Sequence, residues 1–238
     1  METKKIESEE ELSKRKEEWR RMIAHDLRAP LSNISAVLQV IREVSGTRPL
    51  SAKEIELIDI SLRSGKRMME LLDLFLDIAK LDEGVMPVSK KEILLSPLVQ
   101  SVIEDEVSLA RAKNISIEVS IGERETVFAD ENLLERTLQN LLNNALKFTP
   151  RGGKISISLT DKDKISVRDN GIGISQDGMK TLFDRFHQAE ARREGLIQGN
   201  GLGLTFCRQA VRAMGGEIYV HSELGKGSEF TISLPPHP

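Results

Sequence analysis

The first third of the chain carries two apolar stripes with the spacing of a coiled coil. Apolar residues recur three and four positions apart on both sides of a break that contains Gly46 and Pro49. Glycine and proline would end one helix there, and Ser51 could cap the next. The stripe residues are Ala24, Leu27, Leu31, Ile34, Leu38 and Ile41 before the break, and Ile55, Ile58, Leu62, Gly65, Met69, Leu72, Leu76 and Ala79 after it. This spacing predicts a helical hairpin with an apolar seam on each arm.

The two seams also predict an oligomeric state. Two helices alone cannot enclose a core of this length, because each seam has only one covering partner. Pairing two hairpins into an antiparallel four-helix bundle would cover both seams. We therefore expect a homodimer.

The pattern changes after residues 82–87, which read as a linker. Alternating apolar runs and helical periods then follow one another, which predicts an α+β domain with helices on one face of a mixed sheet. Strands are expected at Ile93–Leu95, Ile115–Val119, Ile155–Leu159, Ile165–Val167, Ile218–Val220 and Phe230–Leu234, and helices from Ser96 to about Lys113, at Glu131–Phe148 and at Leu202–Met214. Ser96 is expected to cap the first of these helices, with Pro97 in its first turn.

Composition excludes some classes of function. The net charge is -3, and acidic and basic residues are interleaved, which argues against a nucleic-acid surface. No apolar run approaches the roughly 18 residues that span a bilayer, and no signal peptide opens the chain, so a soluble, cytoplasmic segment is expected. Cys207, the single cysteine, lies in an apolar helical pattern and is expected to be buried and reduced.

One face of the predicted helix Glu131–Phe148 is polar. Arg136, Asn140, Asn144 and Lys147 follow one another at spacings of four, four and three, so they point the same way. Asparagine is a poor residue inside a helix, and two of them beside a lysine suggest amide oxygens for a hard cation and an ammonium for phosphate. A solvated helix face is the alternative.

Two glycine-containing segments could approach a ligand with their backbone. Asp169-Asn170-Gly171-Ile172-Gly173 follows a predicted strand, where a carboxylate can accept from an exocyclic amine and glycines allow a flat ring to approach. Gly199–Leu204 opens a predicted helix, whose free N–H groups favour an anion. An ordinary turn and a flexible hinge are the respective alternatives. The charged stretch 188–198 has a length that suits a lid.

His25 flanks the seam of the first predicted helix. A neutral imidazole, with an ordinary pKa of about 6.5, is a competent nucleophile at neutral pH. The alternative is a surface histidine beside the kink that Pro30 would produce.

Taken together, these segments resemble the bacterial two-component sensor histidine kinases in both order and spacing. The resemblance extends from about Trp19 to Leu234. The matching segments are His25–Leu31 (the H box), Asn140–Pro150 (the N box), Asp169–Gly173 (the first glycine box), Phe183–Phe186 (the F box) and Gly199–Leu204 (the second glycine box).

The resemblance implies an ATP-binding site with Mg²⁺. Asp169 would recognise the adenine amine, in a pocket shaped by Gly171 and Gly173. Asn144 would be the side-chain ligand of Mg²⁺, beside Asn140. The remaining residues that the resemblance places at the nucleotide or its lid are Lys147, Gly201, Leu202 and Gly203, with Phe183 and Phe186 as lid anchors and Arg185 as a weaker candidate.

The resemblance also implies a phosphotransfer sequence. His25 would attack the γ-phosphorus through Nε2, and Asp26 would act on the other ring nitrogen as base or orienter. Neighbours on a helix project about 100° apart, so the role of Asp26 comes from the family and not from geometry. The phosphoryl group would then pass to an aspartate of a response regulator receiver domain. Ala29 stands where the family commonly has Thr or Asn, so weak or absent phosphatase activity is expected.

By the same resemblance the chain divides into four parts. These are a signalling or linker helix over 1–18, a dimerisation and histidine phosphotransfer domain over 19–83, a linker over 84–91 and a catalytic ATP-binding domain over 92–238. A membrane would be involved only through a sensor region upstream. Three rival readings stay open: an ATPase of the chaperone or topoisomerase type on the same fold, a non-catalytic dimeric scaffold, and a Ser or Thr protein kinase.

Overall fold

The structure of the chain is a computed structural model. The structure describes residues 27, 30–41, 50–161, 163–183 and 201–236. The chain forms two compact units, Met1–Asp73 and Leu74–Pro238, and each is described by itself.

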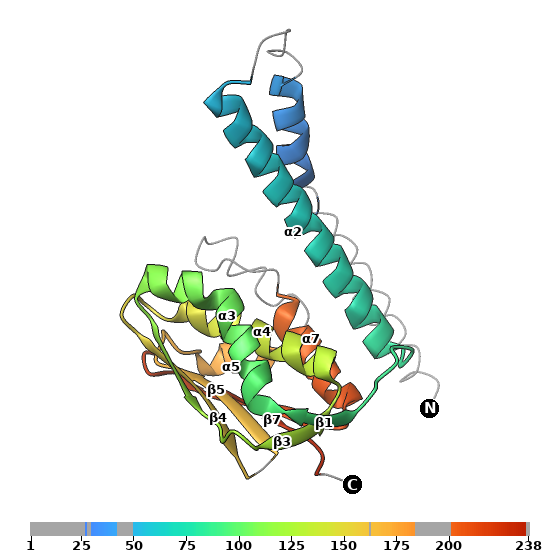
Figure 1. The fold of residues 1–238 in the computed structure, drawn as a ribbon, viewed down its shortest axis with the longest axis vertical. Helices are drawn as coiled ribbons and strands as arrows, with labels where there is room; N and C mark the ends of the chain where they lie inside the picture. Colours follow the sequence, from blue (N-terminus) through green and yellow to red (C-terminus); the bar gives the residue numbers. More distant parts are fainter. Residues whose placement is uncertain (1–26, 28–29, 42–49, 162, 184–200, 237–238) are drawn as a thin grey trace. The chain divides into compact units, whose positions relative to one another are not determined.

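The first unit contains the helical hairpin. Residues 30–41 are helical and lie beside the first part of α2 (Ala52–Asp82), as Figure 1 shows. The two helices touch where Ile34 packs beside Gly65, since a Cβ at Gly65 would lie 3.4 Å from Ile34 Cδ1. The predicted break at residues 45–49 lies outside the described residues.

A capping box begins α2. The Ser51 amide and hydroxyl donate to Glu54 Oε2 at 2.6 and 2.7 Å, and the Glu54 amide donates back to Ser51 Oγ at 3.3 Å. The predicted cap at Ser51 is confirmed, and the reciprocal bonds explain why the Glu54 side chain is buried near the helix end.

The seams of the hairpin are uncovered in the single chain. Ile34, Ile58 and Gly65 are partly buried, and Ile34 and Gly65 face each other between the arms. Other seam positions remain between 46% and 66% exposed: Leu31, Leu38, Ile55, Leu62, Met69 and Leu72. Large apolar side chains spaced along one helix face are rarely left in water without a partner surface.

The second unit is built on a mixed five-stranded sheet with the order β2-β4-β5-β7-β6. Its strands are β2 (Ser116–Ser120), β4 (Lys154–Thr160), β5 (Lys164–Asp169), β6 (Glu217–Glu223) and β7 (Gly227–Ser233). β2 pairs with β4 in parallel, and the other neighbours are antiparallel. A separate antiparallel pair joins β1 (Lys91–Leu94) to β3 (Thr126–Ala129).

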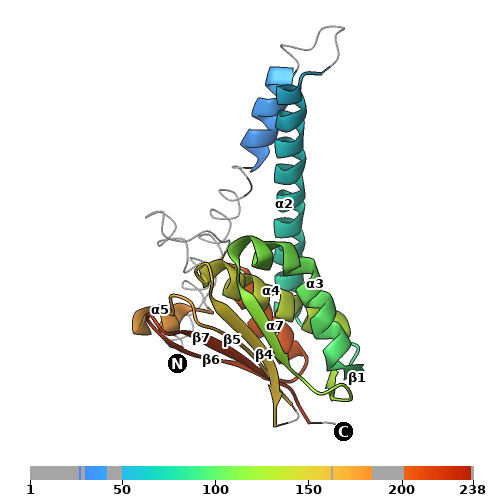
Figure 2. The ribbon, with the colours of Figure 1, turned by 60° about the vertical axis from the view of Figure 1, so that its left-hand side comes forward.

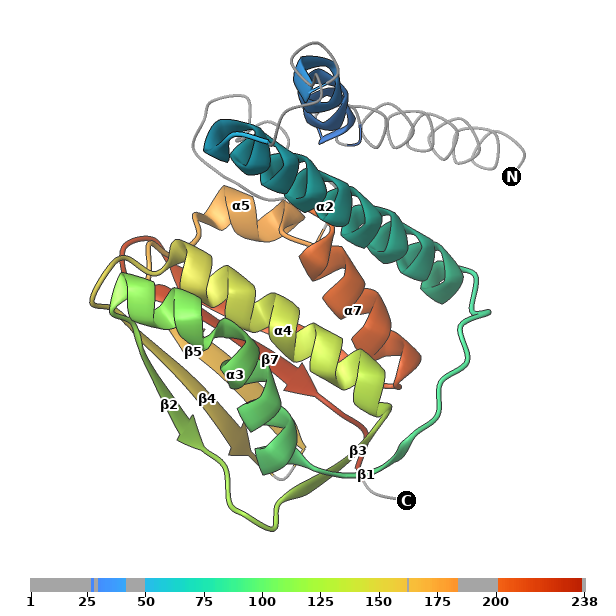
Figure 3. The ribbon, with the colours of Figure 1, turned by 45° about the horizontal axis from the view of Figure 1, so that its top comes forward.

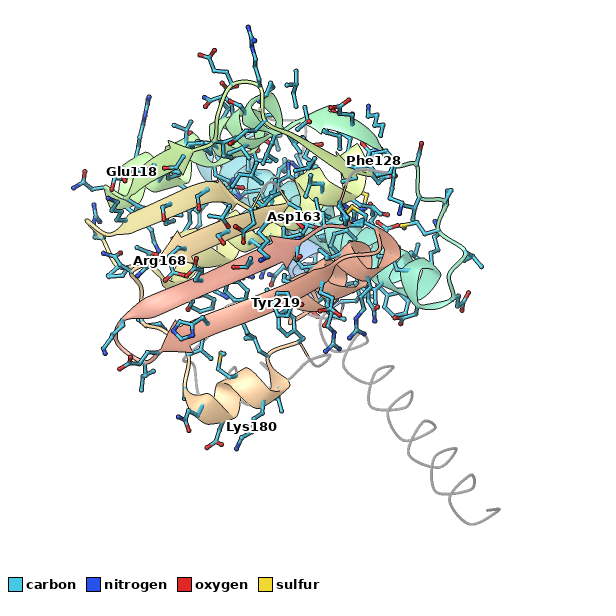
Figure 4. All side chains as sticks on the ribbon, turned by 90° about the horizontal axis from the view of Figure 1, so that it is seen from below. Glu118, Phe128, Asp163, Arg168, Lys180 and Tyr219 are labelled. Atoms are coloured by element: carbon cyan, nitrogen blue, oxygen red, sulfur yellow. The ribbon has the colours of Figure 1, made fainter. Side chains whose placement is uncertain are left out.

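The helices of this unit cover one face of the sheet (Figure 2). Three of them form the cover, α3 (Leu95–Lys113), α4 (Glu131–Phe148) and α7 (Gly203–Ala213), with α4 in the middle (Figure 3), while α5 (Gln176–Thr181) is short. Leu134, Ile155 and Phe206 are among the side chains fully buried between the layers. The opposite face carries polar residues, and Figure 4 looks onto it, with exposed Arg168 and Tyr219 labelled.

The predicted fold class is confirmed, and the predicted helices and strands of the second unit are found within a few residues. Two short elements, β3 and α5, were not predicted. The predicted cap at Ser96 is wrong: α3 begins at Leu95 after Leu94, with no side-chain cap. The Leu95 amide instead donates to Glu125 O at 3.0 Å, so the backbone at the β1–β3 sheet replaces the cap.

Within the described ranges, none of the helices combines the length and the apolarity that a membrane crossing needs.

Candidate nucleotide-binding site

The helix α4 carries the polar face that the sequence predicted. Asp130 caps its N-terminus by accepting from the Leu133 amide at 3.1 Å, and it also accepts from Ser89 N at 2.8 Å. The predicted apolar stripe is buried: Leu134, Leu138, Leu141 and Ala145 are 0–4% exposed. Asn140, Asn144 and Lys147 are only partly buried, so their polar groups lie at the boundary between core and solvent.

Asn140 lies against the start of α7. Its Nδ2 donates to Arg136 O at 2.8 Å, which fixes the amide group. A Cβ added to Gly203 would come within 2.7 Å of Asn140 Oδ1. Two predicted site residues, 63 positions apart in the sequence, are therefore in direct contact, and the absence of a side chain at Gly203 allows the approach.

Arg136, the first residue of the polar face, is held by structural contacts. Its guanidinium forms a 2.6 Å ion pair with Asp77, in the last turns of α2 that belong to the second unit, and lies 4.6 Å from the centre of the Phe206 ring. The amide and ammonium groups of Asn140, Asn144 and Lys147 are thus the part of this face that could meet a ligand.

Asp169 ends the central strand β5 and is 7% exposed. Its Oδ1 accepts from Gly171 N at 2.8 Å, and the Ser228 amide also donates to the carboxylate. Burial raises the pKa of Asp169 above its ordinary value, and the two N–H donors partly oppose that rise. A nearly buried carboxylate with acceptor capacity left can pair with an N–H group of a ligand.

The loop after Asp169 is held on two sides. The Ile172 amide donates to Phe148 O, at the end of α4, at 3.3 Å, and Ile172 O accepts from Gly225 N at 2.7 Å. A Cβ at Gly171 would come within 2.5 Å of Phe148 O, so only glycine lets the loop lie this close to the helix end. Gly173 has φ +67°, and its Cβ would collide with Glu223 O. The absence of a side chain at Gly173 therefore lets the loop lie directly against the turn between β6 and β7.

Two residues of β7 complete the surroundings of Asp169, and sequence reasoning missed both. Ser228 pairs with Asp169 across the sheet, and its hydroxyl lies 3.0 Å from Ser222 Oγ. Gly227 has φ +101°, and a Cβ there would collide with Asp169 O. The short turn between two alternating strands, with Gly225 and Gly227 before Ser228, was the available signal.

The glycine-rich segment is described from Gly201 onward. Gly201 has φ +66°, and Leu202 is 4% exposed, so the Leu202 side chain belongs to the core. Phe183 is described as partly buried: its carbonyl accepts from Thr205 Oγ1 at 3.4 Å, and Arg208 lies over its ring at 5.7 Å. The predicted residues His25, Asp26, Ala29, Arg185 and Phe186 and the stretch 188–198 lie outside the described residues.

The side-chain oxygens of this site fit a magnesium ion that is bound mainly by the phosphates of a nucleotide and by water, with few protein ligands. Among the described residues, no group of three or more His, Cys, Asp or Glu side chains could hold a metal ion. Mg²⁺ usually keeps several waters and is bound through few protein oxygens together with substrate phosphates. The Asn144 amide oxygen, on a helix face that also carries Lys147, has this chemistry.

Two families of known proteins match the chain. Residues 15–84 match the His Kinase A (phospho-acceptor) domain, and residues 129–238 match the family of histidine kinase-, DNA gyrase B-, and HSP90-like ATPases.

Curated relatives and solved structures agree with these matches. The autoinducer 2 sensor kinase/phosphatase LuxQ of Vibrio cholerae is 31% identical over 234 residues, which are 95% of this chain and 27% of LuxQ. The sensor histidine kinase RppB of Synechocystis is 31% identical over 216 residues, 89% of this chain and 47% of RppB. The structure of full-length ShkA in complex with AMPPNP superposes with a TM-score of 0.68 at 27% identity, over 90% of this chain and 45% of ShkA.

The chain belongs to the two-component sensor histidine kinases, of which it carries the catalytic core. It spans between 18% and 56% of the length of eight curated relatives that it matches.

Proposed function

We propose that this protein is a sensor histidine kinase that transfers a phosphoryl group from Mg-ATP to His25, and from there to an aspartate of a response regulator receiver domain. The observation that carries the proposal is the meeting of three segments in the second unit. The polar face of α4, the Asp169 loop and the glycine-rich start of α7 come together through Asn140, Gly203 and Phe148. The AMPPNP in ShkA, a relative at 27% identity, supports ATP as the ligand.

The adenine end of the nucleotide would lie at Asp169. The carboxylate keeps acceptor capacity beside its bonds from Gly171 and Ser228, so it can accept from the exocyclic amine of adenine. The protonated acid could not accept that bond as well, so the ionised form is the one that binds. Gly171, with Gly173 seating the loop, leaves room for a flat ring.

The phosphate end would lie over α4 and the start of α7. Asn144, with Asn140 beside it, would hold Mg²⁺, which supplies charge neutralisation on the phosphates. Lys147 would contact a phosphate directly, and the backbone N–H groups of residues 201–203 would donate to others, since the start of a helix favours anions. Arg185 is proposed as a further contact to phosphate or between domains.

His25 would be the phosphate acceptor. Its Nε2 would attack the γ-phosphorus, while Asp26 orients the ring or takes the proton from the other nitrogen. Both roles are carried over from the family onto the matching positions. We propose the domain division of the family as well: phosphotransfer hairpin over 19–83, linker over 84–91 and ATP-binding domain over 92–238.

We further propose that the hairpin forms the homodimer. The seam positions left uncovered in a single chain, such as Leu38, Leu62 and Met69, are 59–66% exposed, and pairing of two hairpins would bury them. At ~25 cal/mol for each Å² of apolar surface removed from water, several leucine-sized side chains on each hairpin are enough to favour association.

Incubation with γ-³²P ATP tests the proposed function. The proposal expects label on the protein that is acid-labile and alkali-stable, absent in His25→Gln and passed on to a receiver domain. Label released as free phosphate would indicate an ATPase, acid-stable label would indicate a Ser or Thr kinase, and no turnover would indicate a scaffold; each result would contradict the proposal.

A further inference from the structure

The end of α4 is secured by an unusual arrangement of donors. A helix leaves its last four carbonyls without partners, and the chain continues here as Thr149-Pro150, where proline has no N–H to offer. Ala145 O accepts from Thr149 N at 2.9 Å, and Phe148 O accepts from Ile172 N at 3.3 Å. The carbonyls of Leu146 and Lys147 need a donor from elsewhere.

That donor is Lys113, the last residue of α3. Its Nζ donates to Leu146 O at 2.6 Å, to Lys147 O at 3.0 Å and to Thr149 O at 3.2 Å. An ammonium has three N–H groups, and here each has a carbonyl acceptor. The charge also lies at the negative end of the α4 dipole, where a cation is favoured.

The side chain of Lys113 is aimed at α4 by the end of its own helix. Asn114 takes a left-handed conformation with φ 52°, which stops α3 at Lys113. The connection is reciprocal, because Gly152 N donates to Lys113 O at 3.0 Å and Ser116 N donates to Gly153 O at 3.1 Å. The ends of α3 and α4 are thus joined by both side chain and backbone.

This junction lies between the two halves of the proposed nucleotide site. The last turn of α4 carries Lys147, and Asn144 is one turn earlier. The next carbonyl, Phe148 O, accepts a hydrogen bond from Ile172 N in the loop after Asp169. The position of the α4 end therefore sets the separation between the phosphate side chains and the adenine carboxylate.

We propose that Lys113 is a positioning residue for nucleotide binding: it holds the end of α4 so that the phosphate and adenine subsites are spaced for one molecule. The inference rests on the proposed function. Without the ammonium, the carbonyls of Leu146 and Lys147 lose their protein donor, and the last turn of α4 is free to fray. Each subsite would keep its own binding groups, but the distance between the two subsites would no longer be fixed before the nucleotide binds.

The test compares the affinities of two ligands, Mg-ADP and adenosine, for the chain of 238 residues. Calorimetric titration of Lys113→Met should show a loss of Mg-ADP affinity of about tenfold, because part of the binding free energy would then be spent on ordering the end of α4. Adenosine, which occupies the adenine subsite alone, should bind with unchanged affinity. Arg151→Met is the matched control, because the Arg151 guanidinium donates to Ala112 O at the same junction, and Ala112 belongs to α3 rather than α4. It should bind both ligands as the wild type does.

Several outcomes would overturn the inference. Wild-type Mg-ADP affinity in Lys113→Met would do so, and so would an equal loss for adenosine, which would mean general damage to the fold. If Lys113→Met does not fold, Lys113→Gln is used, which keeps two N–H donors without the charge, and wild-type Mg-ADP affinity in that variant would again refute it. Failure of the wild type itself to bind Mg-ADP would instead refute the proposed function.

Discussion

Gly203, the first residue of α7, lies so close to Asn140 on α4 that a Cβ at position 203 would come within 2.7 Å of the amide oxygen. In Gly203→Ala the amide group of Asn140 would have to move and lose its bond to Arg136 O. Because alanine favours a helix, stability should change by less than about 1 kcal/mol. The proposed magnesium and phosphate site would be displaced, so Mg-ADP affinity should fall by roughly tenfold, measured by calorimetric titration.

Gly122→Ala is the matched control for that variant. The atoms nearest to a Cβ at Gly122 would be those of the exposed Glu125 side chain, at 3.2 Å or more, and Mg-ADP affinity should stay at the wild-type value. Equal affinities in Gly203→Ala and the wild type would mean that the contact between α4 and α7 plays no part in nucleotide binding.

The raised pKa of Asp169 makes stability depend on pH in a defined direction. Burial makes the ionised Asp169 carboxylate less favourable in the folded protein than in the unfolded chain, where its pKa has the ordinary value of 3.8. The contribution of this group to stability is therefore largest below pH 3.8 and is lost as the pH rises through the higher pKa of the folded protein. Asp169→Asn does not titrate, so its free energy of unfolding relative to the wild type should increase with pH in this window and then level off.

Urea unfolding of both proteins between pH 4 and pH 7 measures this difference. Asp177→Asn, which changes an exposed carboxylate at the start of α5, should differ from the wild type by less than about 0.5 kcal/mol throughout. If the free energy of unfolding of Asp169→Asn falls relative to the wild type as the pH rises, the pKa of Asp169 is not raised by folding, and the prediction is wrong. The same variant should lose measurable ADP binding, because the proposed acceptor for the adenine amine is altered.

The helix α4 was predictable from sequence to the residue. Its apolar stripe repeats with the helical period, Asp130 is a strong cap, and Pro150 ends the pattern, so all the signals are local. The four-residue strand β3 was missed because its existence depends on pairing with β1, 35 positions earlier, from Lys91 to Thr126. The same pairing supplies Glu125 O to the Leu95 amide, which made the predicted cap at Ser96 unnecessary.

The candidate site was predictable only where its residues belong to local sequence patterns. Asp169 and Asn144 stand in motifs that can be read along the chain. Ser228 comes to Asp169 only through the register of β7 on β5, and Lys113 reaches α4 only because Asn114 ends α3 at that point. Both contacts depend on tertiary arrangement, which no local pattern encodes.

The uncovered seam of the hairpin predicts a dimer that a single charge can weaken. Leu62 is 66% exposed in one chain. In Leu62→Lys the dimer would have to bury an ammonium without a partner, so the dissociation constant should rise by at least about a hundredfold. Analytical ultracentrifugation over a concentration series measures the change.

Arg67→Glu is the control for the dimer, since Arg67 is exposed on α2 and lies two residues from seam positions Gly65 and Met69, on the opposite side of the helix. It should leave the dissociation constant within about threefold of the wild type. An unmodified protein that stays monomeric at high micromolar concentration would contradict the proposed bundle.

Ala29, which lies outside the described residues, stands where the family commonly has Thr or Asn. We expect weak phosphatase activity toward the phosphorylated receiver domain, because alanine cannot hold a water by a side-chain hydrogen bond. Ala29→Thr should restore this activity, measured as the rate of label loss from the receiver. Ala29→Val has the shape of threonine without the hydroxyl and should stay inactive. Robust phosphatase activity in the unmodified protein would argue against this explanation.

Asp169 is the last residue of β5, which lies in the middle of the five strands and is paired on both sides, with β4 and with β7. Amides of such a strand exchange with deuterium only in the rarest and largest openings of a domain, whereas loops at its margins open often. Under the proposed function, nucleotide would enter and leave through these loop fluctuations, while the carboxylate proposed to recognise adenine keeps its position in the sheet. Selectivity for the base would then persist through each exchange of ADP for ATP.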